Sequence, residues 1–375
     1  MRKLMTLVAS ATMVLSATAL TVVPALADPI NSHGKAVTPR ESDIVGVGAD
    51  TDEYLFDQLA VDYNATHPKS AHLYSWDALN PKTGLDENIK TKSGCALIVR
   101  PNGASAGLTS FETNARTKDH SHPCIDYVRS SKGRSATDPP KAKGGIVFVA
   151  VATDVFTYAA NGGKAGTNAP KSLTTARLAA IYNCIDTKWT QVGGKSAATI
   201  RPFLPQTGSG LRSSFLKDIG VTAPGTCVNS SVQQNEGTDH QLLNKPNVLV
   251  PYSVAKYLSQ VFRSNKCTGP KKSGKNQFGC DQHGDLVLDG INGTKPTVGT
   301  GAKQTINPKF SPDFINTIYD VVRWASTKDN IPAYLEPLFA SSRGKVKGWI
   351  CTKKTATQAI KNYGFLTTPF CGTGS

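Results

Sequence analysis

A Gly-Ser-Gly turn at residues 208–210 is the part of this chain best suited to bind an anion. An apolar run stops at Pro205 just before it, and a helix is predicted from Ser209 to Ile219. The first N–H groups of a helix lack partners within the helix, and the helix dipole is positive at that end. Glycines let a ligand approach the backbone, and Ser209 adds a hydroxyl donor. The turn therefore predicts an oxyanion site, although most such turns only reverse the chain.

Other reactive side chains indicate no catalytic or metal chemistry. His120, His122 and Cys124 are close enough in sequence to suggest a metal site, but Pro123 lies among them in a polar loop, which favours an exposed turn. The seven histidines show no ligand spacing. The chain has neither a His-Glu-x-x-His run nor a paired-carboxylate motif. We expect a protein that is not an enzyme and that uses no cofactor and no metal.

The N-terminus predicts export. Met-Arg-Lys precedes an apolar stretch to Val23, and Pro-Ala-Leu-Ala then ends at Ala27. This is the pattern of a secretory signal peptide, so we expect residues 1–27 to be removed. The first cysteine is Cys95, far from the cleavage site, and the sortase-like letters Leu-Pro-Gln-Thr-Gly at 204–208 lie in mid-chain. We expect a secreted or periplasmic protein without a lipid or sortase anchor.

Eight cysteines in an exported chain predict disulfides rather than a metal site. Spacing alone does not fix which cysteines pair, but the positions fall into local groups. The expected pairs are Cys95–Cys124, Cys184–Cys227, Cys267–Cys280 and Cys351–Cys371.

The charge balance is basic. Without residues 1–27 the chain keeps 40 basic and 27 acidic residues, because only Arg2 and Lys3 are lost. Such a charge attracts phosphate, nucleic acid or anionic surfaces. The densest basic cluster, Lys266 to Lys275, is rich in Gly and Ser and lies between two cysteines, without the aromatic residues typical of single-strand nucleic-acid binding. We expect no nucleic-acid partner.

The elements that position the anion turn alternate between strands and helices, which indicates an α/β fold. A helix at 51–66 has an apolar face formed by Leu55, Phe56, Leu59, Ala60 and Tyr63. Strands are predicted at 43–48, 95–99, 125–128, 145–152, 199–204 and 248–251, and further helices from 105 and at 174–183, 209–219, 253–262, 312–325, 332–341 and 355–362.

The order of these elements predicts two lobes joined by a hinge, in a chain that is a monomer by default. The strand at 145–152 continues toward Tyr158 and carries the chain out of the first lobe. The expected divisions are an N-terminal extension at 28–42, the first lobe at 43–150, the second lobe at 151–247, and a return to the first lobe at 248–375 with a disulfide-stapled loop and C-terminal helices.

Several segments in this order resemble the phosphate-type solute-binding proteins of ABC transporters, which have the type II periplasmic-binding-protein fold. Gly46 to Thr51 is similar to the family's opening Gly-x-Gly-(Ala/Ser)-Thr element, and Asn102 to Gly107 to its second glycine-serine turn. Gly208-Ser209-Gly210 is similar to its Gly-Ser-Gly-Thr loop, and Val250 to Tyr257 to its returning strand and helix. The similarity covers most of residues 43–260.

The resemblance implies a two-lobe fold with a hinge and an anion cleft between the lobes, and an ABC permease as partner. Helix N-termini and hydroxyls would hold a phosphate or a related oxyanion without burying a full countercharge. An acidic acceptor, Asp50 or as second choice Asp126, would take the proton of hydrogen phosphate and repel sulfate. The expected ligand-binding residues are Asp50, Thr51, Ser105, Arg129, Ser130, Ser131, Ser209, Gly210 and Arg212.

The sequence also departs from the family pattern. Pro205 stands where the family has an arginine, Leu211 where it has a threonine, and Ser130-Ser131 where it has a Ser-Asp pair. Arg100, Arg129 and Arg212 together would make a more cationic pocket, or each would be a surface arginine at a strand end.

Three functions stay open at this stage. The leading one is a solute-binding protein that captures phosphate or a similar oxyanion for an ABC transporter. The missing arginine and threonine favour a secreted or wall-associated protein that keeps the fold but has lost the anion. A secreted phosphatase is the third, and it would need a nucleophile or a metal cluster that we do not find.

Overall fold

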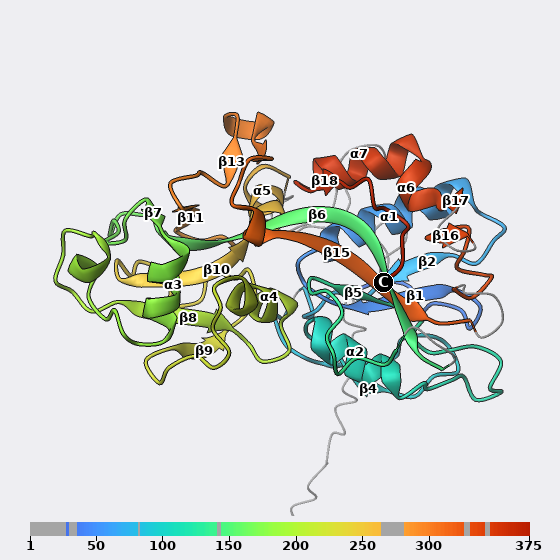
Figure 1. Cartoon of the computed structure of the whole chain (residues 1–375). Coiled ribbons are helices and arrows are strands. Elements are labelled where there is room, and N and C mark those ends of the chain that lie inside the picture. Colours follow the sequence, from blue (N-terminus) through green and yellow to red (C-terminus); the bar gives the residue numbers. More distant parts are fainter. Residues whose placement is uncertain are drawn as a thin grey trace, which may run out of the picture.

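The computed structural model describes residues 28–29, 36–81, 83–140, 144–263, 281–325, 331–341 and 346–375. The predicted signal peptide at 1–27 lies outside these residues. One mixed sheet runs through the molecule (Figure 1). Along its main path the strands are, in spatial order, β2 (Leu73–Ser75), β1 (Ile44–Gly48), β5 (Tyr127–Ser130), β15 (Ile315–Arg323), β6 (Ile146–Asn161), β10 (Val248–Ser253), β8 (Arg201–Pro205) and β9 (Asn229–Val232), and two further short strands pair with β6.

The strand β6 links two lobes. Its first ten residues, 146–155, pair antiparallel with β15, and residues 156–160 pair with β10. Nearly all of its side chains are buried, as expected for a run of Val, Ala and Phe covered on both faces. We call the part built on β2, β1 and β5 the first lobe and the part built on β10, β8 and β9 the second lobe, which lie to the right and left of Figure 1. The strand predicted at 145–152 is thus part of β6, which continues past Tyr158 and pairs with β10.

The first lobe packs α1 (Glu53–Thr66) and α2 (Ala104–Glu112) on opposite sides of its strands. The predicted apolar face of α1 is confirmed, because Leu55, Phe56, Leu59, Ala60 and Tyr63 are all buried. Within this lobe the two-residue strands β3 (Asn88–Ile89) and β4 (Ile98–Val99) form a small separate hairpin. Only the last two residues of the strand predicted at 95–99 are therefore extended.

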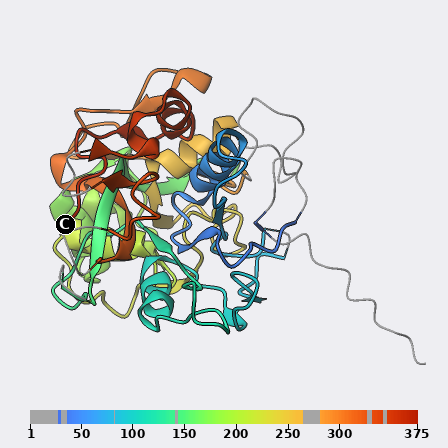
Figure 2. The same cartoon turned by 90° about the vertical axis from the view of Figure 1, so that its right-hand side faces the viewer.

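The second lobe contains α3 (Thr175–Tyr182) and α4 (Gly210–Asp218), both at predicted positions. Leu178, Ile181 and Tyr182 of α3 are buried, as its pattern indicates. The helix α5 (Val254–Arg263) follows β10 directly, and Asp154 of β6 accepts a hydrogen bond from the backbone N–H of Ala255 at 2.9 Å. Figure 2 shows α5, in amber, beside the blue helix α1 of the first lobe.

The remaining elements complete both lobes. Near the second lobe lie β7 (Ser172–Leu173), η1 (Trp189–Val192), β11 (Leu286–Leu288), β12 (Gly290–Ile291), β13 (Thr297–Val298), η2 (Gly301–Lys303), β14 (Thr305–Ile306) and η3 (Pro312–Phe314). The C-terminal part adds β16 (Ala340–Ser341), β17 (Val346–Lys347), α6 (Trp349–Thr352), α7 (Lys354–Asn362) and β18 (Leu366–Thr367) to the first lobe. The sequence predicts that the chain returns to the first lobe at residue 248. The strand that begins there, β10, still pairs with β8 of the second lobe, and the later strand β15 is the one that pairs with β5 of the first lobe.

Two predicted helices are wrong. Residues 315–323 of the segment 312–325 form β15, because its Ile, Thr and Val side chains suit a pleated strand and because β6 and β5 flank it on either side. The segment 332–341 contains turns and the short strand β16 instead of a helix.

Three of the four predicted disulfides are confirmed, namely Cys95–Cys124, Cys184–Cys227 and Cys351–Cys371. The fourth, Cys267–Cys280, lies outside the described residues. A buried ion pair between Asp28 and Arg100, at 2.8 Å, ties the described start of the chain to the first lobe. None of the helices in the described ranges is long and apolar enough to cross a membrane.

Candidate functional site

Ser209 caps the N-terminus of α4, as its place in the turn predicts. Its Oγ accepts a hydrogen bond from the backbone N–H of Arg212 at 3.0 Å. In the part of the chain that is described, the N–H groups of Gly210 and Leu211 make no hydrogen bond. The helix therefore begins with two free amide donors at its positive end, which is the geometry that binds anions.

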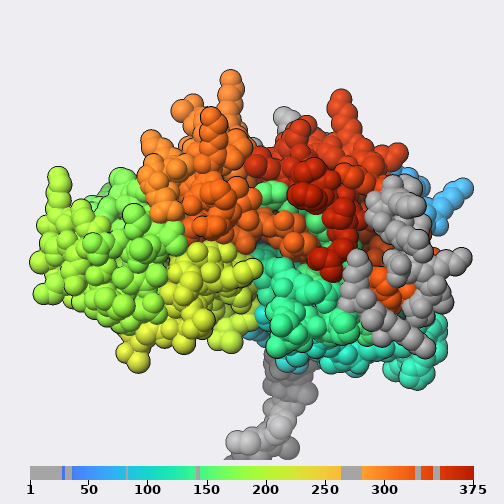
Figure 3. All heavy atoms as spheres, viewed as in Figure 1, coloured from blue at the N-terminus to red at the C-terminus, as the bar shows by residue number. Residues whose placement is uncertain are grey.

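The N-terminus of α4 lies against the N-terminus of α2. The backbone N–H of Ser105 donates to the carbonyl of Gly208 at 3.0 Å. Gly103 has φ of +108°, and a Cβ placed there would lie 2.6 Å from the Gly208 oxygen, so only glycine fits. In the space-filling view the yellow surface around α4 abuts the teal surface around α2 and β5 (Figure 3). The two lobes thus meet at the loops that the sequence predicts as the anion cleft.

Ser131 lies at this contact with an unpartnered hydroxyl. It follows β5, its side chain is fully buried, and its Oγ makes no hydrogen bond within the described residues. A Cβ at Gly210 would lie 2.5 Å from that oxygen, so the hydroxyl faces the first residue of α4. The carbonyl of Ser131 accepts a hydrogen bond from Ser214 Oγ of α4 at 3.0 Å. A buried donor without a partner costs free energy, and a bound acceptor would remove that cost.

The side chain of Gln234 joins Thr51 to Ser209. Its Nε2 donates to Thr51 Oγ1 at 2.6 Å, and its Oε1 accepts from Ser209 Oγ. Gln234 is only 4% exposed. One amide from the second lobe therefore connects a hydroxyl of each lobe.

Asp50 lies next to this bridge, and its carboxylate contacts one amide donor and one ammonium group. Asn235 Nδ2 donates to its carboxylate at 2.7 Å, and Lys256 Nζ of α5 lies 3.0 Å from the other oxygen. The same ammonium is 2.6 Å from Glu53. Burial opposes the charge of Lys256, but Asp50 and Glu53 outweigh it and raise the pKa of the ammonium. The side chain of Asp50 keeps 15% of its surface exposed.

The predicted cationic pocket does not form from the three arginines. Arg129 is fully buried in the first lobe, where it donates to the carbonyls of Ala49 and Trp76 at 3.0 and 2.8 Å. Arg100 is buried with Asp28. Arg212 donates to the Pro205 carbonyl at 2.9 Å, along its own loop. Their guanidinium groups bind acceptors of the chain because buried charges need such partners.

The structure brings six of the predicted residues together, namely Asp50, Thr51, Ser105, Ser131, Ser209 and Gly210. It directs the side chains of Arg129 and Arg212 to other partners, and Ser130 Oγ donates to the Lys132 carbonyl at 2.8 Å. Asp126, the second acidic choice, is turned into the first lobe, where it pairs with Lys92 at 2.6 Å. That any of the six binds an anion stays a prediction.

Sequence reasoning missed the amide side chains at the contact. Gln206 Nε2 donates to Asn102 Oδ1 at 2.7 Å, and Asn102 Nδ2 donates to Gln233 Oε1 at 2.8 Å, so both bonds cross between the lobes. Gln233, Gln234 and Asn235 follow β9 directly. A run of three amides after a strand was the available signal, but such runs are common in loops.

Sequence reasoning also passed over one Gly-x-Ser-x-Gly pattern, at Gly103 to Gly107. In hydrolases this pattern places a serine nucleophile on a strained turn. Here Ser105 lies inside the first turn of α2, it is not among the residues with positive φ, and its hydroxyl makes no hydrogen bond to a histidine in the described ranges. The pattern therefore lacks the geometry of a nucleophile elbow.

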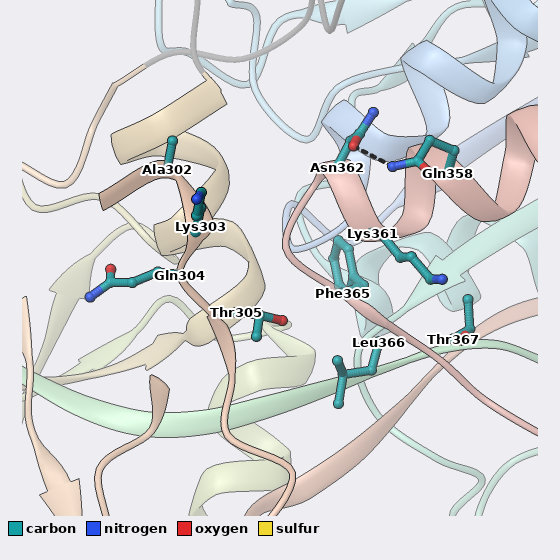
Figure 4. Close-up of a pocket in the computed structure, with 10 residues that line it drawn as sticks. All are labelled: Ala302, Lys303, Gln304, Thr305, Gln358, Lys361, Asn362, Phe365, Leu366 and Thr367. Atoms are coloured by element: carbon teal, nitrogen blue, oxygen red, sulfur yellow. Dashed lines mark hydrogen bonds between the residues drawn. The ribbon is translucent and has the colours of Figure 1, made fainter. Parts of the chain in front are cut away.

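A cavity of about 510 Å³ lies elsewhere, between the 302–305 segment and the end of α7 with β18 (Figure 4). Lys303 and Lys361 are among its lining residues, and Gln358 donates to Asn362 at 2.8 Å on one wall. None of the predicted ligand residues lines it. Among the described residues there is also no group of three His, Cys, Asp or Glu side chains that could hold a metal ion.

Comparisons with known proteins agree with this architecture. The family model for the PBP superfamily domain matches residues 34–286, and no curated protein matches the chain. An ABC-type phosphate transport receptor from Vibrio cholerae aligns with a TM-score of 0.51 at 16% identity, over 87% of this chain and 100% of that one. A structure assigned as a phosphate ABC transporter substrate-binding protein from Clostridium perfringens, with bound phosphate, aligns with a TM-score of 0.53 at 12% identity, over 87% and 99%.

The predicted two-lobe α/β fold is thereby confirmed. Because the family model covers well over half of the chain, the chain belongs to the periplasmic-binding-protein (PBP) superfamily.

Proposed function

We propose that this chain is an extracytoplasmic solute-binding protein that captures inorganic phosphate or a similar oxyanion between its lobes and delivers it to an ABC permease. The observation that carries the proposal is the free N-terminus of α4 facing the unpartnered hydroxyl of Ser131. The two structural neighbours named above, which are described as phosphate transport proteins, have the same fold and lend support.

The donor set suits a tetrahedral anion. Phosphate spreads its charge over four oxygens and is well held by many neutral donors. Here the donors are the amides of Gly210 and Leu211 and the hydroxyls of Thr51, Ser131 and Ser209. The arginines are bound elsewhere, so the site relies on hydrogen bonds and on the dipole of α4 rather than on a full countercharge.

Asp50 provides a means to distinguish protonated from fully ionised oxyanions. Its carboxylate is next to Thr51 and partly exposed, so one of its lone pairs can accept the proton of hydrogen phosphate. Sulfate carries no such proton at neutral pH, and its charge would be repelled. The proposal therefore predicts a preference for phosphate over sulfate.

Calorimetric titration of the purified mature protein with phosphate, and with sulfate in parallel, tests this function. We expect phosphate binding that Ser209→Ala weakens by roughly tenfold, because one hydrogen bond to a charged group contributes about 1.5 kcal/mol. Ser213→Ala is the matched control, since Ser213 is exposed one turn further along α4 and bonds only to the Ser209 carbonyl. No heat with either anion contradicts the proposal.

A second candidate function has its own support. Gln234 already takes up the proton of Ser209 and donates to the Thr51 hydroxyl. This favours a secreted or wall-associated protein that keeps the fold and no longer binds an anion. The same titration decides between the two. A phosphatase, the third candidate, would release product from a chromogenic phosphate ester, and we expect no turnover.

A further inference from the structure

Three consecutive side chains of the second lobe each reach a polar group of the first lobe. We call residues 233–235 the amide strap. Gln233 Oε1 accepts from Asn102 Nδ2 at 2.8 Å. Gln234 Nε2 donates to Thr51 Oγ1 at 2.6 Å, and Asn235 Nδ2 donates to Asp50 at 2.7 Å. Every residue of the strap therefore contributes to the contact between the lobes.

The amide strap is held firmly on its own lobe. The backbone N–H of Gln234 donates to Gln206 Oε1 at 2.8 Å. The carbonyl of Asn235 accepts from Tyr252 Oη at 2.6 Å and from Gln260 Nε2 at 2.9 Å. Asn235 has φ of +54°, a left-handed conformation that asparagine tolerates better than most residues. The strap is thus positioned in advance and loses little freedom when it contacts the first lobe.

The directions of the hydrogen bonds around Gln234 determine which hydroxyl protons are available to an anion. A serine hydroxyl has one proton to donate, and Ser209 gives its proton to Gln234 Oε1 while its lone pair accepts from the Arg212 amide. Thr51 Oγ1 accepts from the other end of the same amide. Ser209 can donate to an anion only after the Gln234 side chain has moved away.

We propose that Gln234 is an internal competitor of the ligand: its amide holds the unliganded lobes together through Thr51 and takes up the proton of Ser209, and the anion must displace it. This inference rests on the function proposed above. The apparent affinity of a protein whose competent state is rarely populated is lowered by that population. Gln234 therefore sets how tightly the anion binds, without being a ligand itself.

Gln234→Ala tests the proposal through two readouts. Small-angle X-ray scattering without ligand should give a larger radius of gyration than the wild type, because the hydrogen bond that joins Gln234 to Thr51 of the first lobe is lost. Phosphate should then bind about tenfold more tightly in calorimetry, because the hydrogen bonds of Gln234 no longer oppose binding. Ser231→Ala is the control, because Ser231 is exposed in β9 just before the strap.

Thr51→Ala separates the closure of the lobes from the binding of the anion. It removes the hydrogen bond of Gln234 to the first lobe and also an anion donor, so the unliganded protein should open while phosphate binds more weakly than to Gln234→Ala. The scattering measurement also shows whether each variant is folded.

The outcomes distinguish this inference from the proposed function. If Gln234→Ala has the radius of gyration of the wild type, Gln234 is not an internal competitor, whatever the affinity for phosphate. Opening without tighter binding, in a wild type that binds phosphate, also overturns it. If Gln234→Ala opens and neither protein binds phosphate, the closure by Gln234 stands and the proposed function fails.

Discussion

Replacing Asp52 by asparagine should stabilise this protein at alkaline pH and not at acidic pH. Asp52 precedes α1, is completely buried, and has no hydrogen bond to its carboxylate oxygens among the described residues. The nearest cation is Arg129, whose Nε lies 3.9 Å away. Asp320, buried opposite Arg129 in the sheet, adds a second unbonded carboxylate to the same cation. Burial raises the pKa of Asp52 to about 7 despite the attraction of Arg129.

The magnitude follows from the difference between the folded and unfolded pKa. Below about pH 4 the carboxyl is protonated in both states, so its contribution to stability is fully present. Between about pH 4 and 7 the unfolded chain releases the proton while the folded chain keeps it, and the free energy of unfolding falls. A difference of about three units corresponds to about 4 kcal/mol lost by pH 8.

Urea unfolding at pH 4.5 and pH 8 measures this effect. The stability of Asp52→Asn minus that of the wild type should increase by about 3 kcal/mol from the lower to the higher pH, because about 1 kcal/mol is already lost at pH 4.5. Glu112→Gln, at an exposed position at the end of α2, should show no such increase. A difference that is the same at both pH values would refute the reasoning, because it would mean that Asp52 is ionised in the folded protein throughout.

Two further predictions concern the contact between the lobes. Gly210→Ala places a methyl group 2.5 Å from Ser131 Oγ, so we expect about 1–3 kcal/mol of destabilisation by denaturant unfolding and weaker phosphate binding in calorimetry. An unchanged free energy of unfolding would show that the contact opens at no cost. Lys256→Met leaves Asp50 and Glu53 without their shared cation. Because burial raises the pKa of Glu53 to about 8, its carboxyl is neutral at pH 4.5, so we expect a loss of about 3–5 kcal/mol at pH 8 and a smaller loss at pH 4.5; equal losses at both pH values would contradict this.

Much of the fold could be predicted because the structure favoured by the local sequence pattern is also the one favoured by tertiary packing. The apolar face of α1 and the cap at Ser209 follow from spacing and hydrogen-bonding chemistry within a few residues. The segment 312–325 was ambiguous, since its apolar residues also fit a helical period. Its pairing with β6, more than 150 residues earlier in the chain, made it a strand.

The candidate site was predicted in its backbone and missed in its side chains. Turns such as 208–210 can be recognised in the sequence by their glycine and serine residues. Arg129 stands at the end of β5, where sequence suggests the cleft, yet its guanidinium turns into the first lobe toward the Trp76 carbonyl. The role of Gln234 depends on Thr51, 183 residues earlier in the chain, and no local pattern encodes such a contact.

A crystal structure of the mature protein grown with phosphate would test the central claim most directly. We expect a tetrahedral anion between the first turn of α4 and Ser131, within hydrogen-bonding distance of Ser131 Oγ and Ser209 Oγ, and with the Gln234 side chain withdrawn. Crystals in which Gln234 still joins Thr51 to Ser209 at a saturating phosphate concentration, with no anion beside Ser131, would contradict it.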